Sequence, residues 1–188
     1  MKEMPKAGFV CLGENALELS GAICCGGRLM RYFNEKGYAM GGCYSCISPS
    51  KQIDSLKKRI LNLCSCNDIV ITVGCEGFRS CDIIPDVTRE LSARTIPHFT
   101  DALCTDGYPD ISGLKKIKCF PSRAIAVMCE NCLVINLPSD TRTALGRLNP
   151  LMSDIAYVTS LSGNKRAFQT VNLGELTADF YCNGSFQD

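Results

Sequence analysis

Residues 74–86 read GCEGFRSCDIIPD and follow directly on the apolar run Asp68–Val73, and this stretch decides the fold. The run is short and rich in β-branched residues, which is typical of a buried strand. Gly74 and Gly77 then allow a tight loop, and Pro85 suits the first turn of a helix. A strand, a glycine loop, an acidic residue and a helix in this order bring backbone N–H groups close to an anionic ligand in α/β proteins.

The segments before this stretch alternate between strands and helices. Strands are predicted at 8–13 and 39–47, and a helix at 28–36 that ends before Gly37. Residues 14–25, between the first strand and this helix, are expected to form a loop. A second helix is predicted at 51–64, because its apolar residues recur at helical spacing, namely Ile53, Leu56, Ile60 and Leu63. Strands separated by helices predict a parallel sheet covered on both faces.

The second half of the chain is less regular. A short helix is expected at 85–93, and 94–114 is expected to be irregular because glycine and proline interrupt it. Segments 118–129 and 132–137 predict a hairpin, and a helix over 144–155 should bend or break at Pro150. We therefore expect a three-layer α/β/α fold with a mostly parallel sheet and a small hairpin. The predicted domain is 7–161, with a tail at 1–6 and a C-terminal extension at 162–188.

Composition limits the partners that this chain is expected to have. The net charge of +1 over 188 residues gives no reason to expect nucleic acid or an anionic membrane as a partner. No apolar run approaches the roughly 20 residues that span a bilayer. No secretory signal is evident in the first residues. The 14 cysteines often lie inside apolar runs, where free cysteine packs as a small hydrophobic residue, so we expect a reduced, cytoplasmic protein.

The cysteine pairs and the single histidine carry little chemistry. Cys43 and Cys46 should point to opposite faces of a strand, which disfavours a shared zinc ion. Cys129 and Cys132 flank a two-residue turn and could be cross-strand neighbours. Cys75 in the glycine loop is either a small residue filling a small space or a thiol activated by nearby N–H groups. His98 stands alone, which excludes multi-histidine metal sites and histidine-based triads.

Asp82 is the candidate functional residue, because it lies directly beyond the glycine loop. Ser122 and Arg123 open another apolar strand, and Arg123 is expected to pair either with an anionic ligand or in an edge salt bridge. The segment 136–142 ends the next strand. In a sheet of parallel strands the loops at the carboxyl ends gather at one edge, so the 74–82 and 138–142 loops could face one another.

These motifs together resemble the molybdopterin-binding domain of the MoaB/Mog type. The resemblance rests on the glycine loop with Asp82, Pro85 and Asp86, on Ser122-Arg123, and on Asn136-Leu137-Pro138 before a helix. It covers roughly residues 7–160. Cys75 and Glu76 stand where that family has glycine and threonine, Ser139 follows Pro138 in place of a glycine, and Ser50 stands where the family has an acid.

The resemblance implies a protein of molybdenum-cofactor biosynthesis that binds molybdopterin and transfers AMP from MgATP to its terminal phosphate. It assigns Asp82 as the catalytic residue and as a ligand of Mg²⁺. It also implies a set of ligand-binding residues, which comprises Gly74, Cys75, Glu76, Gly77, Asp101, Ser122, Arg123, Pro138, Ser139 and Arg142. A homo-oligomer, a trimer or a hexamer, is implied as well.

Two other functions stay open beside AMP transfer. The first is a binding module on the same fold that has lost the chemistry, which Ser50, Cys75 and Glu76 favour. The second is an unrelated nucleotide-binding role, as in CinA-like relatives of this domain. Binding of the ligand without turnover would distinguish the module from the enzyme.

Overall fold

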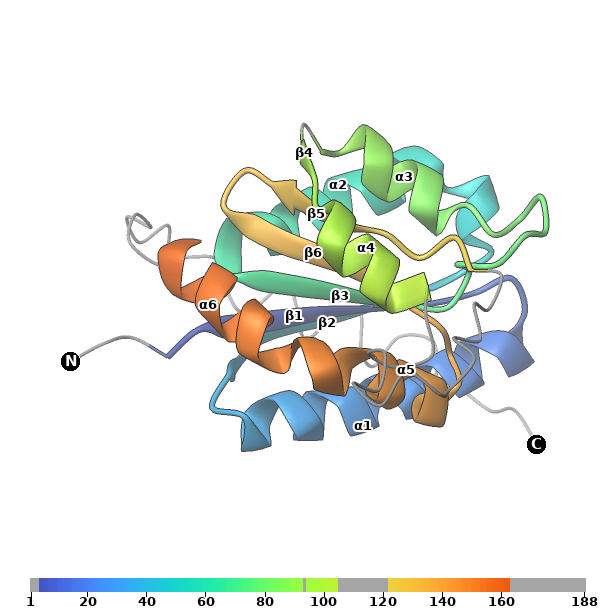
Figure 1. The fold of residues 1–188 in the computed structure, drawn as a ribbon. Helices are drawn as coiled ribbons and strands as arrows, with labels where there is room; N and C mark the ends of the chain where they lie inside the picture. The colour runs from blue at the N-terminus through green and yellow to red at the C-terminus, as the bar shows by residue number, and fades with distance from the viewer. Residues whose placement is uncertain (1–3, 93, 105–121, 163–188) are drawn as a thin grey trace, which may run out of the picture.

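A six-stranded sheet with the strand order β2-β1-β3-β6-β5-β4 forms the middle of the molecule (Figure 1). The computed structural model describes residues 4–92, 94–104 and 122–162. The strands β2, β1, β3 and β6 run parallel, whereas β5 and β4 are antiparallel to their neighbours. Their bounds are β1 Lys6–Gly13, β2 Ala39–Ile47, β3 Ile69–Val73, β4 Arg94–Thr95, β5 Ala126–Cys129 and β6 Cys132–Leu137.

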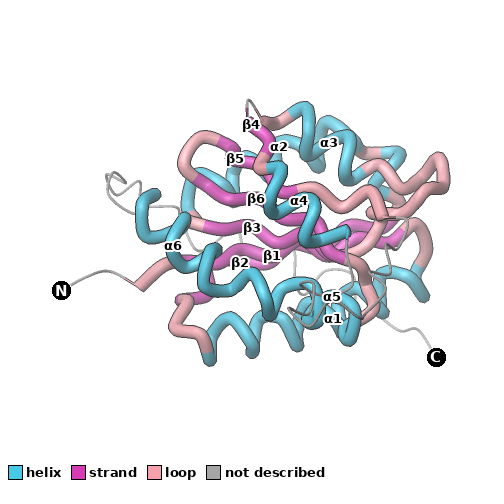
Figure 2. The backbone as a smooth tube through the Cα atoms, viewed as in Figure 1, coloured by secondary structure: helices cyan, strands magenta, loops and turns pink. Residues whose placement is uncertain are grey.

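Helices cover both faces of this sheet, as Figure 2 shows. The helices α1 (Ala16–Glu35), α4 (Pro97–Cys104), α5 (Thr141–Leu148) and α6 (Met152–Ser162) share the apolar core of one face. The helices α2 (Ile53–Cys66) and α3 (Ile84–Glu90) pack on the other. Short 3₁₀ turns at Pro49–Lys51 and Asn149–Leu151 precede α2 and α6. The predicted three-layer α/β/α fold with a mostly parallel sheet and a hairpin is therefore confirmed.

The central strand β1 shows why the two cores form. Phe9 and Cys11 point into the core under α1, and Val10 and Leu12 point into the core under α2. Alternate residues of a strand face opposite sides, so a strand covered on both faces must be apolar throughout. β3 is buried at every position for the same reason. This burial fixes the end of β3, and with it the start of the glycine loop.

The expectation of a loop at 14–25 is wrong, because α1 begins at Ala16. Asn15 caps this helix, and its side chain accepts a hydrogen bond from the Glu18 backbone N–H at 3.0 Å. Glycine lowers helix propensity and hides the pattern in the sequence. At Gly26 the missing side chain is required, because an added Cβ would lie 2.6 Å from the Cys11 sulfur. Packing on β1 therefore outweighs the low propensity.

The expectation of irregular structure from residue 94 is also wrong for the part that is described. β4 pairs with β5, and α4 buries Phe99 and Leu103 on one side. Pro97 begins α4 instead of interrupting it, since proline at the first helical position costs no hydrogen bond. Residues 105–121 lie outside the described ranges, and the predicted strand start at 118 falls among them. Ala126 is the first residue of β5.

Two other predictions about the second half are confirmed. The hairpin turns at Glu130, and Cys129 pairs with Cys132 across it. The last helix is interrupted at Pro150, where a 3₁₀ turn separates α5 from α6. The predicted boundaries of the domain and its two terminal segments stay predictions, and residues 163–188 lie outside the described ranges.

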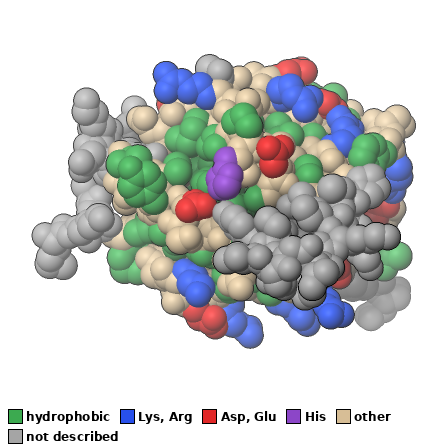
Figure 3. All heavy atoms as spheres, viewed as in Figure 1, with side chains coloured by type: hydrophobic (Ala, Val, Ile, Leu, Met, Phe, Trp, Pro, Cys, Tyr) green, Lys and Arg blue, Asp and Glu red, His purple; other side chains and the backbone are tan. Residues whose placement is uncertain are grey.

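The surface in Figure 3 carries charged side chains of both signs among apolar ones. His98 Nε2 lies 3.6 Å from an oxygen of the Asp154 carboxylate. Among the described residues, no helix combines the length and the apolar character that crossing a membrane requires.

Candidate functional site

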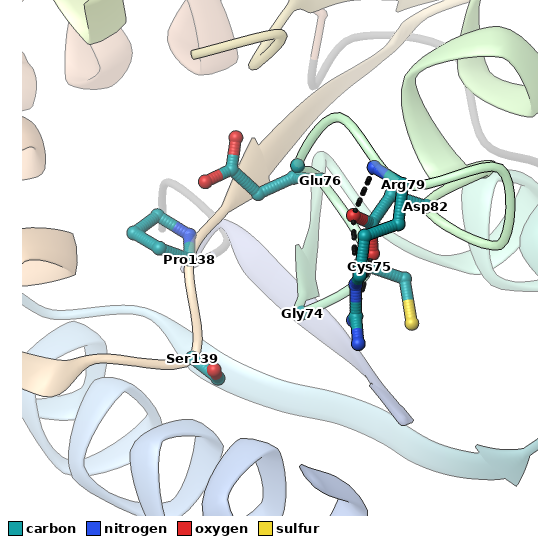
Figure 4. Close-up of a pocket in the computed structure, with 8 residues that line it drawn as sticks. Gly74, Cys75, Glu76, Arg79, Asp82, Pro138 and Ser139 are labelled. Carbon is teal, nitrogen blue, oxygen red and sulfur yellow. Dashed lines mark hydrogen bonds and ion pairs between the residues drawn. The ribbon is translucent and has the colours of Figure 1, made fainter. Parts of the chain in front are cut away.

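A cavity of about 170 Å³ lies where the loop after β3 meets the turn after β6 (Figure 4). β3 and β6 are adjacent and parallel, so their carboxyl ends come out at the same edge of the sheet. The Gly74 N–H donates to the Leu137 carbonyl at 2.9 Å and holds the two loops together. The cavity is lined by Gly74, Cys75, Glu76, Gly77, Arg79, Asp82, Pro138 and Ser139.

The glycines of the loop are required by close approach. Gly74 has φ 92°, and a Cβ there would lie 2.3 Å from the Leu12 carbonyl oxygen. A Cβ on Gly77 would lie 2.7 Å from an oxygen of the Asp82 carboxylate. The first glycine lets the chain leave β3 against β1, and the second makes room for Asp82.

Cys75 is buried beneath the loop and has a left-handed backbone with φ 54°. Burial, and then the negative charge of Glu14, raise the pKa of its thiol to about 12. A thiol with so high a pKa is protonated at neutral pH and is a poor nucleophile. These properties favour a residue that fills space over an activated thiol.

Asp82 is held by an arginine that the sequence analysis did not single out. Its Oδ2 accepts hydrogen bonds from the Arg79 backbone N–H at 2.9 Å and from Arg79 Nε at 3.2 Å. Its Oδ1 accepts one from Arg79 Nη2 at 3.0 Å. Figure 4 shows the two side chains side by side at the cavity. The Asp82 side chain is only 4% exposed, so its carboxylate has little access to water beside the Arg79 contact.

The same guanidinium reaches across to α1. Arg79 Nη1 donates to Glu18 Oε1 at 2.8 Å, and Nη2 donates to Glu18 Oε2 at 3.2 Å. The hydrogen bond from Arg79 lowers the pKa of Glu18 to about 2. Arg79 therefore bridges two carboxylates and ties the glycine loop to the first turn of α1.

Asp82 as arranged here does not fit Mg²⁺. The ion requires octahedral oxygen ligands and keeps several of its waters. Both Asp82 oxygens already accept hydrogen bonds from Arg79, and the side chain has almost no exposed surface for a hydrated ion. No group of three or more histidine, cysteine or acidic side chains suited to a metal ion occurs in the part of the chain that the structure describes.

A second, partly buried cluster joins the loop to α5. Ser122 Oγ donates to Glu76 Oε2 at 2.9 Å, and Arg147 Nη1 donates to Ser122 Oγ at 3.1 Å. Arg147 also lies 3.8 Å from Glu76 Oε1. Burial raises the pKa of Glu76, and the Ser122 hydrogen bond and the Arg147 charge oppose that rise. The charge of Glu76 is thus partly offset within the protein.

Arg123 braces the same loop from the other side. Its Nη1 donates to the backbone carbonyls of Gly77 at 3.3 Å and Asp82 at 3.1 Å, and its Nη2 pairs with the Asp86 carboxylate. Arg123 was expected to pair either with an anionic ligand or in a salt bridge, and in this structure it forms a salt bridge with Asp86. Ser122 and Arg123 thus bind the residues that line the cavity and are not themselves among those lining it.

The structure brings together only part of the predicted site. Pro138 and Ser139 line the cavity opposite the glycine loop. Asp101 is exposed on α4, and Arg142 is exposed in the first turn of α5. Neither is among the lining residues.

Glu14 is a further acid near the cavity that sequence reasoning missed. It follows β1 directly, and its carboxylate accepts hydrogen bonds from the Ser50 N–H at 3.1 Å and the Ser50 hydroxyl at 3.0 Å. The negative charge of Glu14 contributes to the raised pKa of the Cys75 thiol. The signal was present in the sequence as an acid directly after a buried strand, yet nothing there places it beside Ser50.

Cys43 and Cys46 follow the prediction made from strand geometry. Cys43 packs against the core under α1 and Cys46 lies in the core under α2, so the two point to opposite faces of β2. The cysteines within the described ranges carry free thiols.

The sequence matches no model of a known protein family, and no curated protein matches it. Solved structures do. The molybdopterin biosynthesis enzyme MoaB from Thermus thermophilus has a TM-score of 0.67 at 20% identity, with 86% of this chain and 98% of that chain covered. The Mog protein from Mycobacterium ulcerans has a TM-score of 0.65 at 18% identity, with coverage of 84% and 99%. A tungsten cofactor synthesizing protein MoaB from Pyrococcus furiosus has a TM-score of 0.65 at 17% identity, with coverage of 86% and 99%. The predicted resemblance to the MoaB/Mog family is confirmed at the level of the fold.

Proposed function

We propose that this chain binds molybdopterin in the cavity between the glycine loop and the Pro138–Ser139 turn, as a protein of molybdenum-cofactor biosynthesis. One observation carries the proposal. The cavity lies at the carboxyl ends of two adjacent parallel strands, in a fold shared with proteins named for molybdopterin biosynthesis. Ligands of open α/β sheets bind at this edge.

The lining residues suit the anionic end of such a ligand. Consecutive backbone N–H groups in a glycine loop form a concave site for phosphate oxygens. The cavity of about 170 Å³ is smaller than the roughly 300 Å³ at which drug-sized pockets begin, so it would hold one end of the ligand. Glu76 is the one lining carboxylate that Arg79 does not hold, and Ser122 and Arg147 offset its charge. The Gly74 N–H is taken by the Leu137 carbonyl, so we expect the phosphate end against the backbone of Cys75, Glu76 and Gly77.

Transfer of AMP from MgATP to the bound pterin is the second candidate. It is favoured by the position of Asp82 in the cavity wall. The Arg79 contacts on both Asp82 oxygens count against it, because a carboxylate bonded in this way is not available to a metal ion or a substrate proton. Binding without turnover is the function that this geometry supports best.

A single experiment separates the two candidates. The purified protein is incubated with molybdopterin, ATP and Mg²⁺, and both bound pterin and adenylylated product are measured. We expect pterin binding and no product above background. Product that disappears in Asp82→Asn would establish AMP transfer, whereas the absence of pterin binding would contradict the proposed function altogether.

Two properties of the whole protein belong to the same proposal. We expect a homo-oligomer, a trimer or a hexamer, because the resembling family assembles in that way. A monomeric mass in light scattering at micromolar concentration would contradict it. We also expect the protein in the cytoplasm, where reducing conditions suit its many free thiols.

A further inference from the structure

Arg79 is the charged partner of Asp82 in the wall of the cavity. It lies in the loop between β3 and α3, three residues before Asp82, and its side chain runs back along the carboxylate. Two side-chain nitrogens and the backbone N–H of Arg79 all donate to Asp82. A guanidinium fork and a carboxylate match each other in shape, so this pairing is more specific than a point charge would make it.

Little of Asp82 remains for a metal ion. An ionised carboxylate offers about four acceptor positions, and Arg79 takes three of them. The side chain is 4% exposed, and Gly77 packs so close that even a Cβ would lie 2.7 Å from Oδ2. A divalent cation at Asp82 would have to displace the guanidinium, or else lie beside its positive charge.

A second carboxylate, that of Glu18, also binds the Arg79 guanidinium and helps to hold it against Asp82. Glu18 of α1 takes the outer nitrogens of the guanidinium at 2.8 and 3.2 Å. Arg79 is thereby held at both ends, one in the loop and one on α1. The side chain is 56% exposed, so each contact alone would be weak in water, and the shared geometry is what fixes it.

We propose that Arg79 replaces a divalent cation as the charge partner of Asp82, so that this cavity takes its anionic ligand without Mg²⁺. Arg79 is then a positioning residue, because it holds Asp82 and the glycine loop in the geometry that faces the ligand. The inference rests on the proposed function for the identity of the ligand. Its first test needs no ligand, so the two can fail separately.

The first test is a titration with Mn²⁺ alone, a spectroscopic substitute for Mg²⁺ with the same preference for oxygen ligands. Binding is followed by electron paramagnetic resonance for wild type, Arg79→Gln, Asp82→Asn and the double variant. The wild type should bind Mn²⁺ no better than Asp82→Asn. Arg79→Gln should bind about tenfold more tightly than wild type, since it uncovers the carboxylate, and the double variant should lose that gain.

Arg89→Gln is the matched control. Arg89 also pairs with an aspartate three residues away, Asp86, but on the exposed surface of α3 and away from the cavity lining. It should leave Mn²⁺ binding unchanged. Saturable Mn²⁺ binding by wild type that Asp82→Asn abolishes would overturn the inference. That arm uses an isosteric substitution, so it decides the question even if Arg79→Gln fails to fold.

The second test measures molybdopterin binding by wild type in EDTA and in excess Mg²⁺. Equal affinities are expected. Binding that requires Mg²⁺ would overturn the inference while leaving the proposed function intact.

Discussion

The absence of a side chain at Gly77 leaves the space that the Asp82 carboxylate occupies. A Cβ there would lie 2.7 Å from Asp82 Oδ2, which Arg79 holds in position and which therefore cannot easily move aside. Gly21, in the middle of α1, has open space where its Cβ would be. The two glycines thus differ in a way that mutation can expose.

We predict opposite effects of alanine at these two positions. Gly77→Ala should lower the free energy of unfolding by about 1–2 kcal/mol, because it displaces a bonded carboxylate. Gly21→Ala should raise it by about 0.5–1 kcal/mol, because alanine favours a helix over glycine. Urea denaturation checks both. Equal effects of the two substitutions would contradict the close approach at Gly77.

Cys75 should be unreactive in the folded protein. Burial raises the pKa of its thiol from 9.0 to about 12, so at pH 8 its thiolate fraction is about a thousand times smaller than that of an unperturbed thiol. Cys24 is exposed on α1 and serves as the internal comparison. Iodoacetamide labelling followed by mass spectrometry should modify Cys24 and leave Cys75 free. Modification of Cys75 at a similar rate would revive the activated-thiol alternative.

Glu18 gives a pH-dependent signature of the Arg79 bridge. Its pKa is lowered from 4.5 to about 2, so the stability that the bridge supplies is present above about pH 4.5 and is lost as the pH falls toward 2. An NMR titration should show this pKa in wild type and a return toward 4.5 in Arg79→Gln. An unchanged Glu18 pKa in the variant would show that the bridge does not form in solution.

At the scale of elements, Asn136 connects the strands β3 and β6 and the helix α3. Its side chain in β6 donates to Thr72 in β3 at 2.8 Å and to Thr88 in α3 at 3.0 Å, and all three residues are buried. The sequence marked Asn136 only as part of an Asn-Leu-Pro motif. The structure gives it a packing role beneath the cavity edge.

Asn136→Ala should lower the free energy of unfolding by about 1–3 kcal/mol, because it leaves two buried hydroxyls without their donor. Asn34→Ala, on the exposed surface of α1, should change it by less than about 0.5 kcal/mol. Thermal and urea denaturation measure both. A neutral Asn136→Ala would mean that the network contributes little to holding β3, β6 and α3 together.

The strands β1 and β3 match their predicted bounds to within a few residues, because apolar runs in a covered sheet leave little choice. The edge strand β2 matches its predicted bounds of 39–47 as well, although only Cys46 in it is buried. The start of α1 was missed because Gly21, Gly26 and Gly27 lower the helix propensity of its early and middle turns, and the contact of Gly26 with β1 is visible only in the structure. α4 was missed because Pro97 reads as an interruption when it is in fact a helix start.

At the scale of the whole molecule, the sequence could predict which loops meet but not how their charges pair. The meeting of the Gly74 loop with the Pro138–Ser139 turn follows from adjacent parallel strands. The bonds from Arg79 to Glu18, and from Arg147 to Ser122, join residues far apart in the chain. No local pattern signals these two contacts, so the pairing of Glu18 with Arg79 and of Ser122 with Arg147 became visible only in three dimensions. The contact of Arg79 with Asp82 spans only three residues.

The binding of molybdopterin to this cavity is the central claim, and a titration with a blocked variant tests it most directly. Ser139→Tyr places a bulky side chain at the exposed edge of the cavity, and Ser160→Tyr places the same side chain on the exposed surface of α6, outside the cavity lining. Calorimetry should show saturable binding of molybdopterin to wild type and to Ser160→Tyr, and at least about tenfold weaker binding to Ser139→Tyr. Binding that is equal in all three proteins, or absent from wild type, would contradict the account.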